Sequence, residues 1–394
     1  MKDELEDHMA GREIIIVGGG MVGALSALLL AQKGDVIHLI EKSSFNIPAQ
    51  NDPVDLRVSA FSAQSKYLLE QANVWELIPN NRLCAYQELH TWEAGSKKLI
   101  FSSADIGAEQ LGYIAENRWI QGAIWQLLKQ HDFVFFYENS EVSNINQEVN
   151  QVTVTLQDET KISAELLLAC DGVNSAIRNK LQMPCVSWDY RHHCLLIHIT
   201  TDSDQQNVTW QEFRETGPCA FLPLAGNNAS LVWYHSPQKI KHLQSLNHYQ
   251  LKQVILDEFP TLDFEFDVQN KGAFPLTRRH ANHYYQGRVV LLGDAAHSIN
   301  PLAGQGVNLG FKDVQCLVEL LTECSDLPIP EILKRYQCKR RPANLLMQTG
   351  MDVFYKVSKS DANLIRIFRR NFLNIAQQSG EIKNRVMRYA MGIN

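Results

Sequence analysis

The chain has 394 residues, of which 45% are hydrophobic and 20% charged, which is the composition of a globular protein long enough for two or three domains. A formal net charge of −6 gives no global indication of nucleic-acid binding. The eight cysteines form no C-x-x-C pair, and four of the first seven residues are acidic, so we expect no cysteine metal site, no signal peptide, and free thiols in a reducing cytoplasm.

The first predicted element is a buried strand at 14–17, followed by a glycine-rich turn and an apolar helix over 24–31. The turn fits the pattern G-x-G-x-x-G. A second strand at 36–40 ends in Glu41, 18 residues after the last glycine of the turn. In such a unit the glycines let the backbone approach a pyrophosphate, and the acid binds ribose hydroxyls. The sequence therefore predicts a dinucleotide site. The alternative is a membrane span over 14–32, but four glycines divide that run into strand and helix.

The middle of the chain contains a region of mixed strands and helices, followed by a region rich in strands. We expect a short hairpin over 81–101 and an amphipathic helix over 116–129. Three strands follow within 133–170, and the region from about 184 to 277 is rich in strands, with one helix near 247–258. The predicted domains are a cofactor domain at 10–80, 102–183 and 280–345, a substrate domain at 81–101 and 184–279, and a helical tail at 346–394.

A second turn lies at 171–178, between an apolar strand and the start of a helix. Asp171 and Gly172 form a tight turn, Ser175 is placed to cap the helix, and Arg178 could meet a phosphate or an acid. A capped helix without any ligand has the same pattern, so this turn alone predicts little.

A third turn follows the buried strand at 288–292. Asp294 stands at the strand's end, and a Pro and a Gly-x-Gly turn precede a helix with apolar positions at Leu309, Val314 and Leu317. An acid beside a helix start suits a large polar cofactor, because the acid binds hydroxyls and the helix start stabilises negative charge. For His297 we expect a supporting role next to the cofactor rather than metal ligation, and we expect no metal site.

The three turns, in this order, resemble the motifs of the class A flavoprotein monooxygenases, the FAD-dependent aromatic hydroxylases with a p-hydroxybenzoate hydroxylase-like fold. The resemblance implies an α/β fold, with a Rossmann-like FAD-binding domain interrupted by a β-rich substrate domain and followed by a C-terminal helical tail. It also implies tight, non-covalent FAD. The residues implied in FAD binding are Gly18, Gly20, Met21, Val22, Gly23, Glu41, Arg57, Arg118, Asp171, Gly172, Asp294, Pro301, Gly304, Gln305, Gly306, Val307 and Asn308.

Further stretches at 273–280, 300–310 and 333–336 are similar to the ubiquinone-biosynthesis hydroxylase group of this family. This resemblance implies O₂ and a polyprenylated benzoquinol or phenol as substrates, with NAD(P)H or another reductant. It implies ring hydroxylation through a C4a-hydroperoxyflavin, because no side chain could hydroxylate a ring carbon without a cofactor. Candidate substrate-lining residues in the β-rich region are Phe221, Pro223, Trp233, Phe274, Pro275 and Leu276, each of which could equally be a core residue.

The C-terminal part is strongly basic. From Glu331 onward there are 13 basic and 4 acidic residues, and the apolar positions have helical spacing. Such an end predicts contact with a membrane surface or an acidic partner, and a basic face exposed to solvent fits it equally well. With the resemblance, it implies a cytoplasmic protein at the inner membrane surface, near other ubiquinone-biosynthesis proteins. Two alternatives remain: a hydroxylase of a small soluble aromatic, and a non-catalytic flavin-binding subunit of a biosynthetic complex.

Overall fold

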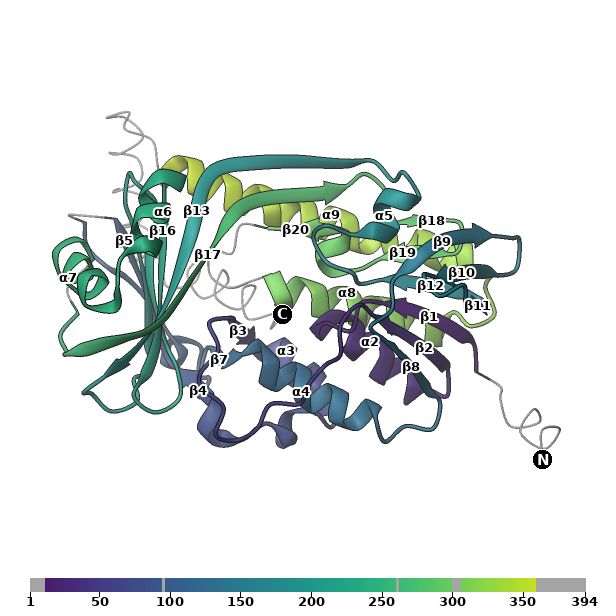
Figure 1. Ribbon diagram of the computed structural model, residues 1–394, viewed down its shortest axis with the longest axis horizontal. Helices are drawn as coiled ribbons and strands as arrows, with labels where there is room; N and C mark the ends of the chain where they lie inside the picture. Colours follow the sequence, from purple (N-terminus) through teal and green to yellow (C-terminus); the bar gives the residue numbers. More distant parts are fainter. Residues whose placement is uncertain (1–10, 94–95, 260–261, 300–305, 359–394) are drawn as a thin grey trace.

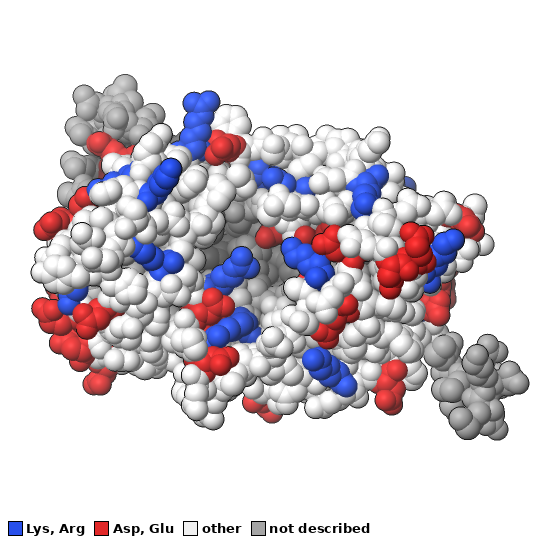
Figure 2. Space-filling view, viewed as in Figure 1, with Lys and Arg blue, Asp and Glu red and all other residues white. Residues whose placement is uncertain are grey.

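The computed structural model describes residues 11–93, 96–259, 262–299 and 306–358. The chain forms an α/β part and a β-rich part, and two long strands run from one to the other (Figure 1). This is the interrupted arrangement that the sequence predicts. Figure 2 shows a hollow between the two parts, with both basic and acidic side chains around it.

The α/β part is built on a six-stranded sheet whose central strands are parallel. Its innermost strands are apolar and buried on both faces, as expected of a parallel sheet with both faces covered. The predicted strands at 14–17, 36–40 and 166–169 are confirmed. In spatial order the strands are β18 (Tyr285–Gln286), β19 (Val289–Leu291), β12 (Leu166–Ala169), β1 (Glu13–Val17), β2 (Val36–Glu41) and β8 (Val134–Glu138).

Helix α2 (Met21–Ala31) connects β1 to β2 and packs against both α4 (Asn117–Leu128) and α8 (Gly306–Glu323). These three helices bury apolar faces in one large core with the sheet. The predicted apolar positions of α8 are all buried. A long helix, α9 (Ile329–Ser358), packs on α8 and contains Pro342. Shorter helices are α3 (Ala63–Gln71), α5 (Ala176–Lys180), η1 (Trp75–Leu77), η2 (Asn80–Arg82), η3 (Ser103–Ile106) and η4 (Gly293–Ala295).

The β-rich part is an eight-stranded sheet with α6 (Pro237–Ser245) and α7 (His248–Glu258) on one face. Its long central strands are antiparallel and extend across the top of the molecule into the α/β part (Figure 1). The other face of this sheet is turned toward the α/β part. The strands, in spatial order, are β20 (His297–Ser298), β17 (Phe266–Ala281), β13 (Cys185–Thr201), β16 (Asn228–His235), β15 (Cys219–Pro223), β14 (Val208–Phe213), β5 (Glu88–Glu93) and β6 (Leu99–Ser102).

Two three-stranded sheets complete the fold. One lies between the two parts and contains β3 (Val58–Ser62), β7 (Gly112–Glu116) and β4 (Leu83–Tyr86). The other shares the core of the α/β part and contains β9 (Val142–Gln147), β10 (Val152–Leu156) and β11 (Lys161–Ala164).

Several boundaries differ from the sequence expectation. Strand β4 belongs to the small sheet, although the predicted substrate domain begins at residue 81. The predicted tail boundary at 345/346 falls inside α9, because that helix continues from 329 to 358. Strands β9 and β11 were missed because exposed polar residues dominate them, and α6 was missed although Ser236 caps it and Pro237 opens it.

Most of the predicted tail, residues 359–394, lies outside the described residues. Among the helices that are described, none is both long and apolar enough to cross a membrane.

Candidate functional site

The first turn leaves the start of α2 open. Gly18 has a φ of +102°, which only glycine adopts readily, and a Cβ there would lie 2.4 Å from the Cys170 carbonyl oxygen. At Gly23 a Cβ would lie 1.9 Å from the Gly18 carbonyl oxygen. A Cβ on Gly20, the residue preceding the helix, would meet no atom within 4 Å. The turn is therefore packed on its inner side and open on its outer side, which is the cradle that a pyrophosphate needs at a helix N-terminus.

Glu41 and α4 hold this turn in place. The Glu41 carboxylate accepts the Gly19 amide at 2.6 Å from the end of β2. The Gly19 carbonyl oxygen accepts the indole N–H of Trp125 and the amide of Gln121, both at 2.8 Å. The sequence analysis did not single out these two α4 residues, because nothing local relates them to a turn about 100 residues earlier.

Met21 and Val22, predicted as cofactor contacts, form the first turn of α2. The Val22 side chain faces the third turn, because Cβ atoms added at Gly293 and Gly310 would lie 3.1 and 2.6 Å from its Cγ2. The Val22 side chain therefore packs α2 against the third turn and α8.

The second turn is joined to the third. Ser175 caps α5 as predicted, and Asp171 Oδ2 accepts the Ile177 amide at 3.1 Å. Asp171 Oδ1 is buried without a hydrogen-bond partner among the described residues. Arg178 was expected to meet a phosphate or an acid. Among the described residues its buried guanidinium donates instead to the carbonyl oxygens of Ala295 and Val173, at 2.7 and 3.0 Å, and so joins the two turns.

In the third turn, one acidic side chain is exposed and its neighbours are buried. Asp294 is accessible to solvent, yet the protein around it desolvates the carboxylate and raises its pKa, an effect that His297 opposes. His297 is turned away toward α8, where its Nε2 lies 2.5 Å from Asp313 Oδ2. A supporting position was expected for this histidine, but the sequence analysis did not identify Asp313 as its partner.

The remaining predicted contacts lie at or before the start of α8 and differ in their surroundings. Gly306 and Val307 line a cavity. The Asn308 side chain is buried and bonds to β3 and α3, with its Oδ1 accepting from the Ser62 amide at 3.0 Å and from the Ser65 hydroxyl at 2.6 Å. Asn308 thus anchors the helix start, which its sequence position does not reveal. Pro301, Gly304 and Gln305 lie outside the described residues.

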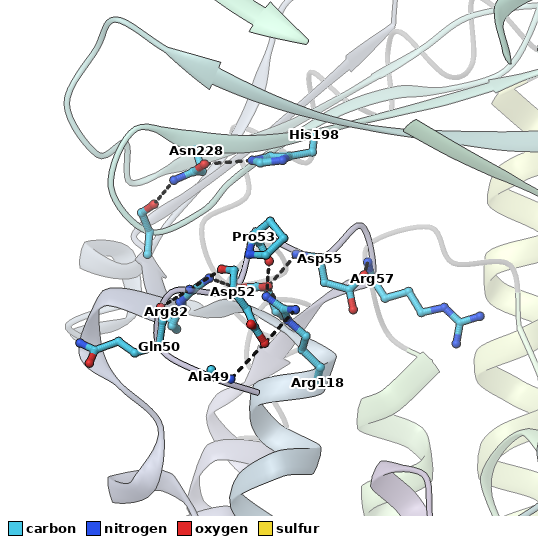
Figure 3. A network of polar contacts seen from close by, with 12 residues as sticks. Ala49, Gln50, Asp52, Pro53, Asp55, Arg57, Arg82, Arg118, His198 and Asn228 are labelled. Carbon is cyan, nitrogen blue, oxygen red and sulfur yellow. Dashed lines mark hydrogen bonds and ion pairs between the residues drawn. The ribbon is translucent and has the colours of Figure 1, made fainter. Parts of the chain in front are cut away.

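The two predicted arginines differ in their surroundings (Figure 3). Arg118 donates to Glu116 at 3.0 Å and to the Pro53 carbonyl oxygen. Arg82 pairs with the other oxygen of the same buried carboxylate, also at 3.0 Å. Arg57 is exposed and its guanidinium points away from this cluster. Of the two arginines, Arg57 is exposed to solvent, whereas Arg118 is half-buried.

An apolar cavity of about 220 Å³ lies beside the starts of β3 and α8. Its floor is the face of the eight-stranded sheet that α6 and α7 leave uncovered. It is lined by Val58, Ser59, Ala60, Tyr86, Leu89, Ile114, Cys194, Leu196, Thr209, Trp210, Gln211, Ala220, Leu222, Val232, Tyr234, Phe274, Gly306 and Val307.

Of the six predicted substrate-lining residues, only Phe274 lies on this cavity. Phe221 and Trp233 are buried in the core beneath α6 and α7. They lie on the opposite face because side chains alternate along a strand, so Ala220, Leu222, Val232 and Tyr234 face the cavity instead. Leu276 is buried in a small cluster with Cys194 and Tyr234, Pro223 is buried away from the cavity, and Pro275 is exposed without lining it.

A second, polar pocket of about 510 Å³ continues along the same sheet face. Its walls include Glu116, Arg82 and, two residues beyond the cavity residue Leu196 on β13, His198. The His198 ring lies 2.9 Å from the Asn228 side-chain oxygen, and burial lowers the pKa of this histidine (Figure 3). The sheet face is thus apolar next to β3 and α8 and polar next to the Glu116 cluster.

The FAD binding domain family model matches residues 12–349 of the chain. The 3-demethoxyubiquinol 3-hydroxylase of Escherichia coli (strain K12) is 39% identical over 97% of this chain and 98% of its own. The mitochondrial ubiquinone biosynthesis monooxygenase COQ6 of Xenopus tropicalis is 29% identical over 96% of this chain and 93% of its own. Among solved structures, p-nitrophenol 4-monooxygenase PnpA from Pseudomonas putida DLL-E4 superposes with a TM-score of 0.78, at 18% identity over 97% of this chain and 98% of that one, which shows the same fold.

Proposed function

The chain belongs to the FAD-binding domain family, and from that premise we propose that it hydroxylates the ring of a polyprenylated benzoquinol or phenol intermediate in ubiquinone biosynthesis. It is an FAD-dependent aromatic monooxygenase. The observation that carries the proposal is the apolar cavity, which is bordered by the starts of β3 and α8 next to the third turn. A planar apolar ring fits such a cavity, and the three turns border the expected cofactor site.

The residues of the site fit FAD. The bare start of α2 suits the pyrophosphate, and the Glu41 carboxylate at the end of β2 suits the adenosine ribose. Asp294 is exposed where hydroxyls of the ribityl chain could bond to it. When bound, FAD supplies the activation of O₂, with NAD(P)H or another reductant as the electron source. The protein holds the ring in the cavity and keeps water out of it.

The choice within the group rests on sequence. The stretches 91–93, 231–234 and 350–355 resemble 2-octaprenyl-3-methyl-6-methoxy-1,4-benzoquinol hydroxylase. The Escherichia coli relative is a 3-demethoxyubiquinol 3-hydroxylase, and its similarity to this chain supports a demethoxy-type quinol as the substrate class. We therefore expect a quinol with an open ring position to be the preferred substrate.

The test is a turnover assay with the full chain reconstituted with FAD. A short-tail demethoxy-type quinol and a soluble hydroxybenzoate are compared, and product is measured by mass under ¹⁸O₂. We expect one labelled oxygen in the quinol product and none in the benzoate. Hydroxylation of the benzoate alone would indicate a soluble-aromatic hydroxylase. Bound flavin without either product would indicate a non-catalytic subunit, and absence of bound FAD would refute the whole scheme.

We also propose that the basic C-terminal segment brings the enzyme to the cytoplasmic surface of the inner membrane, where a polyprenyl substrate resides. Residues 359–394 carry seven basic and two acidic side chains. Basic residues beside apolar ones favour an anionic lipid surface. Gln348 bonds to the body of the protein, so a truncation should begin after residue 358 rather than near 345.

Co-sedimentation with vesicles containing anionic lipid should therefore be stronger for the full chain than for the chain ending at residue 358. Vesicles of neutral lipid serve as the control. Equal sedimentation of both proteins would contradict the membrane proposal and favour contact with another ubiquinone-biosynthesis protein.

A further inference from the structure

One face of α9 carries four polar residues at intervals of four, Arg340, Asn344, Gln348 and Asp352, and this polar ladder points into the protein. Residues four apart on a helix lie on the same face, so the ladder is a continuous stripe. Arg340, counted with the basic residues of the tail by sequence, is thus part of the interior.

The lower end of the ladder meets Asp313, which is fully buried on α8. Arg340 Nε donates to Asp313 Oδ1 at 2.7 Å, and the Asn344 amide donates to the same oxygen at 3.0 Å. The other carboxylate oxygen lies 2.5 Å from His297 Nε2 and accepts the Gly293 amide at 3.2 Å. Burial alone would raise the pKa of Asp313, but His297, Arg340 and Asn344 outweigh burial and lower it to about 2. Asp313 is therefore an ionised carboxylate, and its hydrogen bonds among the described residues go to the third turn and to α9.

The upper end of the ladder holds the far side of the same turn. The Gln348 amide donates to the carbonyl oxygens of Ser298 and Arg279, at 2.9 and 2.8 Å, and its oxygen lies 2.7 Å from His280 Nδ1. Asp352 bonds to Tyr190 and pairs with Arg278. The segment from Gly293 to Ser298 is thereby held at both ends by side chains that reach it from α8 and α9.

We propose that Asp313 is the positioning residue of the flavin site. It bonds to Gly293 and His297, on either side of Asp294, and so fixes the carboxylate that faces the cofactor. Arg340 and Asn344 of the α9 ladder bond to Asp313 and hold it in place. This inference rests on the proposed function, because it assigns Asp294 to FAD. Because Asp313 is fully buried, its proposed role is to position Asp294 rather than to touch the cofactor. The competing account is a buried ion pair that serves only stability, although such pairs often contribute little net stabilisation.

The test compares Asp313→Asn with Glu323→Gln, a matched loss of one carboxylate from the exposed end of the same helix. Two quantities are measured: the dissociation constant of FAD, and the yield of hydroxylated quinol per flavin in a single turnover after photoreduction. Photoreduction makes the yield independent of the natural reductant. A purely structural role would lower the folded fraction and leave the yield per bound flavin unchanged.

For Asp313→Asn we expect the FAD dissociation constant to rise about tenfold, the equivalent of one lost hydrogen bond, and the yield per flavin to fall by about half or more. Glu323→Gln should match the wild type in both quantities. Unchanged affinity or unchanged yield in Asp313→Asn overturns the proposal, even if the melting temperature falls.

If Asp313→Asn does not fold, Asn344→Ala provides the same test, because it removes one donor to Asp313 and leaves the ion pair with Arg340. We expect smaller changes in the same direction, and wild-type values in both quantities overturn the proposal. Asp294→Ala serves as the reference variant, because it removes the carboxylate that Asp313 is proposed to position. If the wild-type protein itself binds no FAD, the proposed function fails. If the wild type is active and Asp313→Asn has the same FAD affinity and yield per flavin as Glu323→Gln, only the positioning role fails.

Discussion

Phe221 and Leu222 are neighbours on β15, and their side chains lie on opposite faces of the eight-stranded sheet. Phe221 is buried in the core beneath α6 and α7, with its ring 5.6 Å from that of Phe264. Leu222 is half-buried and lines the apolar cavity. A single step along the strand therefore separates a residue buried in the core from one that lines the cavity we propose for the substrate.

Alanine substitution of these neighbours should separate stability from substrate binding. Phe221→Ala leaves a large hole in a packed core, and we expect the free energy of unfolding to fall by about 3–5 kcal/mol. Leu222→Ala should cost less stability and instead raise the KM for the quinol. Urea unfolding and initial-rate kinetics on both variants measure this. A larger KM effect from Phe221→Ala at equal folded fraction would contradict the assignment of faces.

The first turn offers a second matched pair. Gly20→Ala adds a methyl group to open space, so the protein should fold with nearly normal stability but bind FAD more weakly, because the methyl group occupies the pyrophosphate cradle. Gly23→Ala forces a Cβ to within 1.9 Å of the Gly18 carbonyl oxygen, so the backbone must move and the fold itself should suffer. Thermal unfolding of both proteins without FAD, followed by flavin titration, distinguishes the two effects. Normal FAD affinity in Gly20→Ala would place the pyrophosphate elsewhere.

Asp294→Ala should weaken FAD retention with little loss of stability, because the Asp294 side chain is exposed to solvent. The predicted change is a dissociation constant raised about tenfold or more, the effect of one lost hydrogen bond to a charged group. The flavin content after gel filtration measures it, with Asp326→Ala on the exposed surface as the control. Equal flavin content in both variants would remove Asp294 from the site.

The local pattern predicts the strands and turns well because each depends on residues close together in sequence. The β-branched run before Gly18 and the apolar run before Asp294 are examples, and both become buried strands. The face of the sheet on which the Phe221 side chain lies could not be predicted in the same way. Strands β15 and β16 are apolar on both faces, so alternation alone does not reveal which face α6 and α7 cover.

The polar contacts of the site were the least predictable part. Asp313 is a single acid within a helix, and its partners His297 and Arg340 are 16 and 27 residues away. Asn308 looks like a cofactor contact in the turn motif, yet its amide is bonded to β3, 248 residues earlier in the chain. Such pairings are decided by how helices pack, which no short motif encodes.

Stability should also depend on pH through His280. Burial lowers the pKa of this histidine from 6.5 to about 4, and the positive charges of Arg278 and Arg341 act in the same direction while Gln348 opposes them. Between these values the unfolded chain binds a proton that the folded protein does not. The free energy of unfolding therefore rises with pH across this window, and the contribution is lost as pH falls from about 6.5 to 4.

We expect the wild type to lose about 1–2 kcal/mol more stability than His280→Asn between pH 7 and pH 5, measured by urea unfolding. The exposed His283 supplies the control, because His283→Asn should leave the wild-type pH dependence in place. Identical pH profiles for the wild type and His280→Asn would show that His280 is protonated equally in both states.

Substitution of the two arginines near β3 should likewise separate an effect on FAD binding from an effect on stability. Arg57→Ala removes a solvent-exposed charge at a predicted FAD contact, so we expect weaker FAD binding at unchanged stability. Arg118→Ala removes one of the two cations paired with the buried Glu116 and should lower the free energy of unfolding by about 1–2 kcal/mol. Urea unfolding without flavin and FAD titration measure the two effects independently. Loss of stability in Arg57→Ala would mean that its side chain also supports the fold, and normal stability in Arg118→Ala would mean that its ion pair with Glu116 contributes little to stability.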